Sequence, residues 1–199
     1  MIVISNPTAI ANEINTIHAL FDRGLELFHV RKPEFSAEEI KTFVTAIGLK
    51  YRNKLILHSH HHLAEDLGMN RLHFSEKMRK QIDSETLYHY NEKRIHLSTS
   101  IHTTEAFNDL RIFFQYAFLS PVFASISKSN YQSDIDLLKA IENRTNFNTK
   151  LVALGGIEAQ NIKKTLDAGF DDVALLGTIW NTNQPIKNFE LCQQIVLLY

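Results

Sequence analysis

Short apolar runs of strand length alternate along the whole chain with segments whose apolar residues recur at helical spacing. The first pattern indicates buried strands, and the second indicates amphipathic helices. We predict strands at residues 2–5, 25–30, 55–58, 71–74, 94–98, 112–119, 151–154 and 173–176. Between them we predict helices at residues 9–21, 36–47, 63–68, 103–110 and 134–142, and after the last two strands.

Local signals support this alternation. Ser36 and Glu39 have the spacing of a capping box, which marks a helix start. Gly24, Gly68 and Gly169 each follow a helical segment, where a left-handed residue ends the helix. The polar stretch 77–92 has the weakest pattern, and there we expect a short helix and a loop.

Strand–helix units repeated in this way predict parallel strands, and a closed barrel accounts for their number better than an open sheet. We therefore predict a single α/β domain over residues 1–199 with a (β/α)8 TIM-barrel fold. Because 199 residues are few for this fold, its helices and loops must be short.

The last two predicted strands share a feature that suggests a ligand. Each ends in glycine immediately before a helical pattern, at Gly155-Gly156 and at Gly177-Thr178. Glycine lets the backbone approach a ligand closely, and the start of a helix favours an anion. Barrels of this class often bind phosphate after strands seven and eight, although two tight turns without a ligand would leave the same pattern.

Cationic and hydroxyl side chains follow other strands, at the end of the barrel where such folds carry their chemistry. Arg31, Lys32 and Ser100 follow or end strands two and five. The segment after strand six is rich in hydroxyl groups, and it contains Ser125, Ser127 and Lys128. Together these side chains predict an anionic ligand.

Composition argues against other partners. Lys plus Arg (21) balance Asp plus Glu (22), so no basic field favours nucleic acid or an anionic membrane. No stretch is apolar enough to span a bilayer, and no signal peptide is recognisable. A single cysteine, Cys192, cannot form an intrachain disulfide. We expect a cytoplasmic protein that binds a small phosphate ester, either as a monomer or as a homo-oligomer.

Several motifs in their order along the chain carry a family resemblance. They are His29-Val-Arg31, Leu72-His-Phe74, Ser100-Ile-His-Thr103, Pro121-Val-Phe-Ala-Ser-Ile-Ser-Lys128 and the two glycine turns. In these motifs the chain resembles the thiamine-phosphate synthase and thiazole tautomerase superfamily over nearly its whole length.

The resemblance implies roles for individual residues. Arg31 would hold a pyrimidine diphosphate, and Ser100 would lie near the pyrimidine. Gly156 and Gly177 would receive a thiazole phosphate. Ser125 and Lys128 would contact phosphate groups.

The chain departs from the synthase pattern where Mg²⁺ would bind. His58-Ser59 stands where the synthase presents Asn-Asp, and Met78 stands near its second aspartate. Only Glu76 could replace these carboxylates. Because Mg²⁺ prefers carboxylate oxygens and neutralises a leaving diphosphate, a synthase reaction would need it here.

The tautomerase branch moves protons without a metal, using a histidine that would fall at Pro121 in this chain. His58 and His29 are the candidate general acid–base groups instead, because imidazole suits proton transfer near neutral pH. For His73 we expect a hydrogen-bonded core position, and a zinc pair at His58 and His60 is a minor alternative.

Three hypotheses remain. The preferred one is metal-independent proton transfer on a thiazole phosphate, with no cofactor. The alternatives are a Mg²⁺-dependent thiamine-phosphate synthase and a non-catalytic thiazole-phosphate-binding protein.

Overall fold

Eight parallel strands form a closed barrel, with each strand paired to its neighbours in chain order. The computed structural model describes residues 1–124 and 137–199. β1 pairs with both β2 and β8, which closes the ring. The strands are β1 (Ile2–Ile4), β2 (Leu27–Val30), β3 (Leu55–Leu57), β4 (Arg71–Phe74), β5 (His96–Ile101), β6 (Phe114–Leu119), β7 (Lys150–Leu154) and β8 (Asp172–Leu175). The predicted TIM barrel is therefore confirmed.

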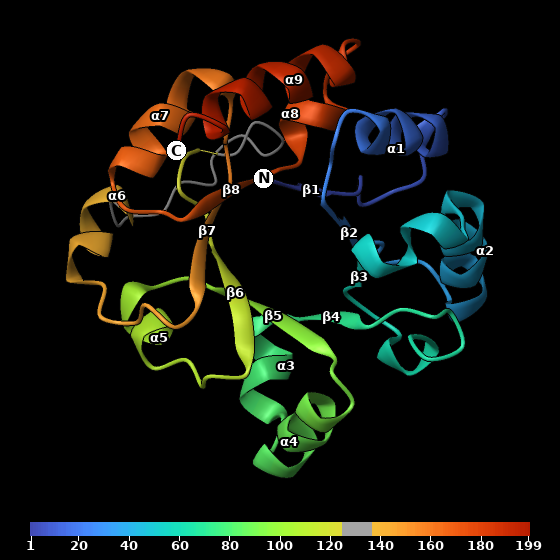
Figure 1. The fold of residues 1–199 in the computed structure, drawn as a ribbon, viewed down its shortest axis with the longest axis horizontal. Helices are drawn as coiled ribbons and strands as arrows, with labels where there is room; N and C mark the ends of the chain where they lie inside the picture. The colour runs from blue at the N-terminus through green and yellow to red at the C-terminus, as the bar shows by residue number, and fades with distance from the viewer. Residues whose placement is uncertain (125–136) are drawn as a thin grey trace.

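Helices surround this ring of strands (Figure 1). The α-helices are α1 (Glu13–Asp22), α2 (Ala37–Ile47), α3 (Glu76–Gln81), α4 (Ser84–Glu92), α5 (Thr104–Asn108), α6 (Leu137–Ala140), α7 (Ala159–Asp167), α8 (Gly177–Trp180) and α9 (Pro185–Val196). The 3-10 helices are η1 (Leu49–Lys54), η2 (His61–Leu63) and η3 (Ile141–Asn143). Most of these elements are short, as the chain length requires.

Alternating strand residues separate two apolar clusters. The outer cluster, between strands and helices, includes Val3, Phe28 and Val30. The inner cluster fills the barrel from β1, β6, β7 and β8 with Ile2, Ile4, Tyr116, Phe118, Val152 and Ala174. Because successive strand residues face opposite sides, His29 between Phe28 and Val30 faces inward.

Some boundaries differ from the predicted ones. The first helix begins at Glu13 rather than at residue 9, because Asn12 takes a left-handed conformation with φ 59°. The fifth strand runs on to Ile101, which places Ser100 within it. The sixth strand starts at Phe114 rather than at residue 112. Of the helix predicted at 134–142, residues 134–136 lie outside the described part of the chain.

The stretch 77–92 contains two helices rather than one helix and a loop. Each has its own N-cap, where the Ser75 side chain accepts from the backbone N–H of Met78 and the Asp83 side chain accepts from that of Thr86. The capping box predicted at Ser36 and Glu39 is present at the start of α2. No helix within the described ranges combines the length and apolar character needed to cross a bilayer.

Candidate active site

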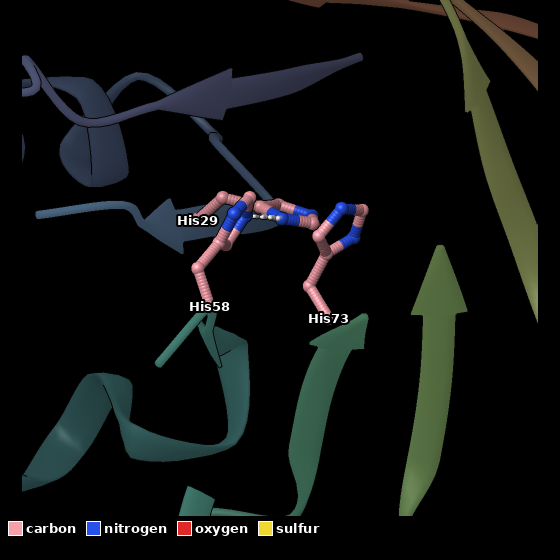
Figure 2. A group of neighbouring side chains, drawn as sticks. All are labelled: His29, His58 and His73. Atoms are coloured by element: carbon pink, nitrogen blue, oxygen red, sulfur yellow. Dashed lines mark hydrogen bonds between the residues drawn. The ribbon is translucent and has the colours of Figure 1, made fainter. Parts of the chain in front are cut away.

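Three histidines meet inside the barrel at the C-terminal ends of adjacent strands (Figure 2). His29 lies on β2, His73 lies on β4, and His58 is the first residue after β3. One ring nitrogen from each lies within 4.8 Å of the other two. We call these three residues the histidine cluster.

His29 is bonded at both of its ring nitrogens. Its Nδ1 shares a 2.7 Å hydrogen bond with Nε2 of His58, and its Nε2 shares a 2.6 Å hydrogen bond with the hydroxyl of Tyr116. A neutral imidazole carries one N–H, so His29 donates through one nitrogen and accepts through the other. The three side chains therefore form a directed chain of hydrogen bonds that crosses the barrel from β3 to β6.

His73 is held by two serine hydroxyls of β5. Its Nδ1 lies 2.9 Å from Ser98 Oγ, and its Nε2 lies 2.9 Å from Ser100 Oγ. Ser98 Oγ also bonds to the carbonyl oxygen of Leu72 at 3.3 Å. That bond uses the only hydroxyl proton of Ser98, so His73 Nδ1–H donates to Ser98 and Nε2 accepts from Ser100. The interpretation of His73 as a hydrogen-bonded core histidine is confirmed.

Burial keeps the histidine cluster uncharged. It lowers the pKa of His29 and of His58 well below the ordinary value, and it lowers the pKa of His73 to about 3. Protonating one histidine also disfavours protonating the next, and the charges of Arg31 and Arg71 lower these pKa values further. Burial also raises the pKa of Tyr116 well above its ordinary value, so its hydroxyl keeps its proton at neutral pH.

The next histidines along the chain do not join the cluster. His60 bonds to the carbonyl oxygen of Phe35 at 2.9 Å, and His62 is exposed. His61 is half-buried and bonds to the carbonyl oxygen of His73 at 3.1 Å. Among the described residues, one set of three or more histidine, cysteine or carboxylate side chains could hold a metal ion. It consists of His29, His58 and His73. The structure therefore does not favour the predicted zinc pair of His58 and His60.

Two predicted cations at the end of β2 have different surroundings. Arg31 is exposed, and its backbone is fixed by bonds of 2.8 and 3.0 Å to the hydroxyl of Ser5. Lys32 is buried, and its Nζ lies 2.6 Å from a carboxylate oxygen of Glu13 and 2.8 Å from the carbonyl oxygen of Thr8. The structure thus places the Lys32 ammonium in a buried ion pair rather than on a surface open to phosphate.

The first glycine turn is covered by the segment that follows β6. The backbone N–H of Phe123 donates to the Gly155 carbonyl at 3.1 Å. A Cβ added at Gly156 would lie 2.5 Å from the carbonyl oxygen of Ala124. Glycine is required here by close packing of two backbone segments, whether or not a phosphate also binds.

The second glycine turn borders a cavity of about 450 Å³ between α7, α8 and α9. Gly177 and Thr178 line it, together with Glu158 at the start of α7. The Thr178 hydroxyl donates to the carbonyl oxygen of Ile157, which ties the two turns together. The Glu158 carboxylate disfavours an anion within this cavity, so a phosphate at Gly177 would have to approach from another side.

The remaining candidates divide between described and undescribed residues. Glu76 lies 2.8 Å from Nζ of Lys80 and 3.7 Å from Nε2 of His102, and the hydrogen bond from Lys80 is the main cause that lowers the pKa of Glu76. The hydroxyl of Ser100 is hydrogen-bonded to Nε2 of His73. Ser125, Ser127 and Lys128 lie outside the described residues.

Sequence reasoning missed Tyr116, whose hydroxyl bonds to Nε2 of His29. Tyr116 lies on a strand that was predicted from its apolar residues. Tyr116 does carry a signal, because a phenolic hydroxyl within a buried strand needs a partner. Tyr116 lies two residues before Phe118, so both side chains face the inside of the barrel. The partner of the Tyr116 hydroxyl must therefore also lie inside the barrel.

Comparisons with known proteins agree with the barrel and with the sequence motifs. The family model described as thiamine monophosphate synthase matches residues 1–179. Thiamine-phosphate synthase from Streptococcus suis is 28% identical over 141 residues, which cover 69% of this chain and only 59% of that protein. The same enzyme from Desulfitobacterium hafniense is 24% identical over 179 residues, covering 85% of this chain and 83% of that protein.

A solved structure extends the match to the full length. Thiamine phosphate pyrophosphorylase from Bacteroides thetaiotaomicron is 27% identical and superposes with a TM-score of 0.76, covering 100% of this chain and 98% of that one.

Replacing Gly156 by alanine should lower the free energy of unfolding because of the contact with Ala124. Gly68→Ala is a matched control, since its φ of +63° equals the +62° of Gly156 within one degree and nothing lies within 4 Å of its added Cβ. We expect Gly156→Ala to cost about 2 kcal/mol more than Gly68→Ala in urea unfolding. Equal losses would show that the segment after β6 does not constrain this turn.

The buried histidines should make stability depend on pH. Their pKa values are lower in the folded than in the unfolded chain, so unfolding takes up protons below about pH 6.5. Stability should be full above that pH and decline from it toward the folded pKa of His73, about 3. The loss should steepen below pH 6.5 and approach about 1.4 kcal/mol per pH unit for each buried histidine about one unit lower, measured by urea unfolding. His73→Gln should reduce this slope and exposed His62→Gln should not. If His73→Gln left the slope of unfolding free energy against pH unchanged, His73 would not be a buried histidine with a lowered pKa.

Proposed function

The chain belongs to the thiamine monophosphate synthase family, and we propose that it binds a thiazole phosphate and transfers a proton on it without a metal. His58 is the proposed general acid–base group, and His29 supports it. The observation that carries this proposal is the hydrogen-bonded pair of His58 and His29 at the C-terminal ends of β3 and β2. Family membership supports a role in thiamine biosynthesis, and the choice of reaction rests on this pair.

Several features of the pair suit proton transfer. His58 is half-buried and His29 is fully buried, so His58 is the member within reach of a ligand. At neutral pH burial keeps both rings unprotonated, which is the form a general base needs. A proton accepted by His58 leaves a buried imidazolium, which returns it readily to a second atom of the substrate. Tautomerisation requires both of these steps.

The residues present do not fit the magnesium site of a synthase. Glu76 is the one carboxylate proposed for that metal, and it is engaged by Lys80 and close to His102. The imidazoles of the histidine cluster are poor ligands for a hard cation such as Mg²⁺. The synthase reaction remains the second candidate because the named relatives are synthases, among them the Bacteroides thetaiotaomicron protein matched over the full chain.

Substrate recognition would use the exposed side of the barrel. For the second candidate, the synthase reaction, we propose that Arg31 holds a diphosphate, because its guanidinium is exposed and no ion pair with a carboxylate is found for it among the described residues. Gly156, Gly177 and Thr178 are the proposed thiazole-phosphate contacts. Ser125, Ser127 and Lys128 remain proposed phosphate contacts on the strength of their motif alone.

His58→Asn should lower the metal-free rate of proton transfer by about 10²–10⁴-fold and leave ligand affinity nearly unchanged. The assay is thiazole tautomerisation by the purified full chain in the presence of a chelator, with affinity measured by calorimetry. Exposed His62→Asn is the matched control and should keep the full rate. Because burial lowers the pKa of His58 well below its ordinary value, the rate should not fall as the pH drops through 6.5 and should fall only at lower pH.

Two outcomes would contradict the proposal. Robust release of diphosphate that depends on Mg²⁺ would identify a synthase. Tight thiazole-phosphate binding with no turnover in either assay would identify a non-catalytic binding protein.

Arg31→Ala should weaken binding of a diphosphate-bearing pyrimidine at least about tenfold, and should change the affinity for thiazole monophosphate much less. A guanidinium can bind two phosphate oxygens at once, which favours the diphosphate. Arg23→Ala removes an exposed arginine paired with Glu190 and is the control. Equal losses for the two ligands in Arg31→Ala would argue against separate subsites.

A further inference from the structure

We propose that His29, His58 and His73 form a binding site for a divalent transition metal of the zinc class. The proposal concerns metal binding by the chain and does not depend on the proposed function. A metal held there would occupy the nitrogens that proton transfer needs, so the metal-loaded protein would lose that activity.

The cluster has the ligand type and the size of such a site. Each residue offers one ring nitrogen, and these atoms lie within 4.8 Å of one another. Zinc binds imidazole nitrogen at about 2.0–2.1 Å, which puts tetrahedral ligand atoms about 3.3 Å apart. The 2.7 Å between His29 Nδ1 and His58 Nε2 is shorter than this, so these two rings would separate by about half an ångström around a metal.

Ring orientation fits for two of the three pairs. The His29 ring meets those of His58 and His73 edge-on, with centroids 5.0 and 5.3 Å apart. The His58 and His73 rings are stacked at 4.1 Å, so one of them must turn for both to face a single ion. His58 is the ring that can turn, because it follows the strand and is half-buried, whereas His73 is bonded at both nitrogens.

Hydrogen bonds from neighbouring hydroxyl groups already fix the orientation of the His29 and His73 rings. The Tyr116 hydroxyl holds Nε2 of His29, which leaves Nδ1 for a metal once the bond to His58 opens. Ser98 and Ser100 flank His73, so one hydroxyl keeps a hold on the ring when the other nitrogen binds metal. Such partners fix the orientation of ligating histidines in metalloproteins.

The donor set selects the class of metal. The cluster includes no carboxylate, and imidazole favours zinc, copper or nickel over Mg²⁺ and Ca²⁺. The positive charge of Arg31 acts on His58 and His73, so it opposes a bound cation. Three protein ligands leave a fourth position for water or an anion.

Cobalt absorption tests this site without an activity assay. Purified full chain is freed of metal with a chelator and titrated with Co²⁺, whose visible spectrum reports tetrahedral coordination. We expect saturation at one ion per chain with a tetrahedral spectrum. His58→Asn should weaken binding by roughly 100-fold or more, and the exposed histidine variant His62→Asn should bind as the parent does. Thermal melting of each variant establishes that it is folded.

Two further measurements test the site without removing one of its histidines. Arg31→Ala should tighten Co²⁺ binding because it removes an opposing charge. X-ray absorption of the zinc-loaded parent should show three imidazole ligands. Absence of saturable binding to the folded parent, equal losses in His62→Asn and His58→Asn, or fewer than three imidazole ligands would each overturn the proposal.

Discussion

The interior of this barrel depends on the hydrogen bond between His29 and His58. An imidazole placed among apolar side chains is unfavourable unless its polar atoms find partners. His29 is fully buried, packs against Phe118 with ring centroids 4.8 Å apart, and meets this requirement through His58 on one side and Tyr116 on the other. Because His58 directly follows β3 and Tyr116 lies on β6, these two bonds connect opposite sides of the barrel through its interior.

The interior consequently has two halves of different chemistry. Apolar residues from β1, β6, β7 and β8 fill one side, whereas β2, β4 and β5 contribute His29, His73 and Ser98 to the other. Neutral imidazoles, with no carboxylate among them, dominate this second half. That difference favours proton transfer and transition-metal binding over Mg²⁺ chemistry, and the two proposals compete for the same nitrogens.

The fold was predictable because strand and helix patterns alternate without interruption, and the carboxyl ends of strands identified His29 and His58. Their pairing was not predictable, because it depends on register: β2 and β3 align Val30 with Leu57, which sets His58 one step beyond the strand end. Lys32 was predicted near phosphate from its position next to Arg31. Its partner Glu13 lies on the preceding helix, and only the folded chain brings the two together.

The central claim is that the three clustered histidines are uncharged and joined in a fixed pattern of hydrogen bonds. Nitrogen-15 NMR of imidazole-labelled, metal-free protein measures both properties at once. We predict that His29, His58 and His73 stay neutral as the pH falls through 6.5, each as a single tautomer, with Nδ1 of His73 protonated. Titration of these rings near pH 6.5, or rapid averaging between tautomers, would contradict the account.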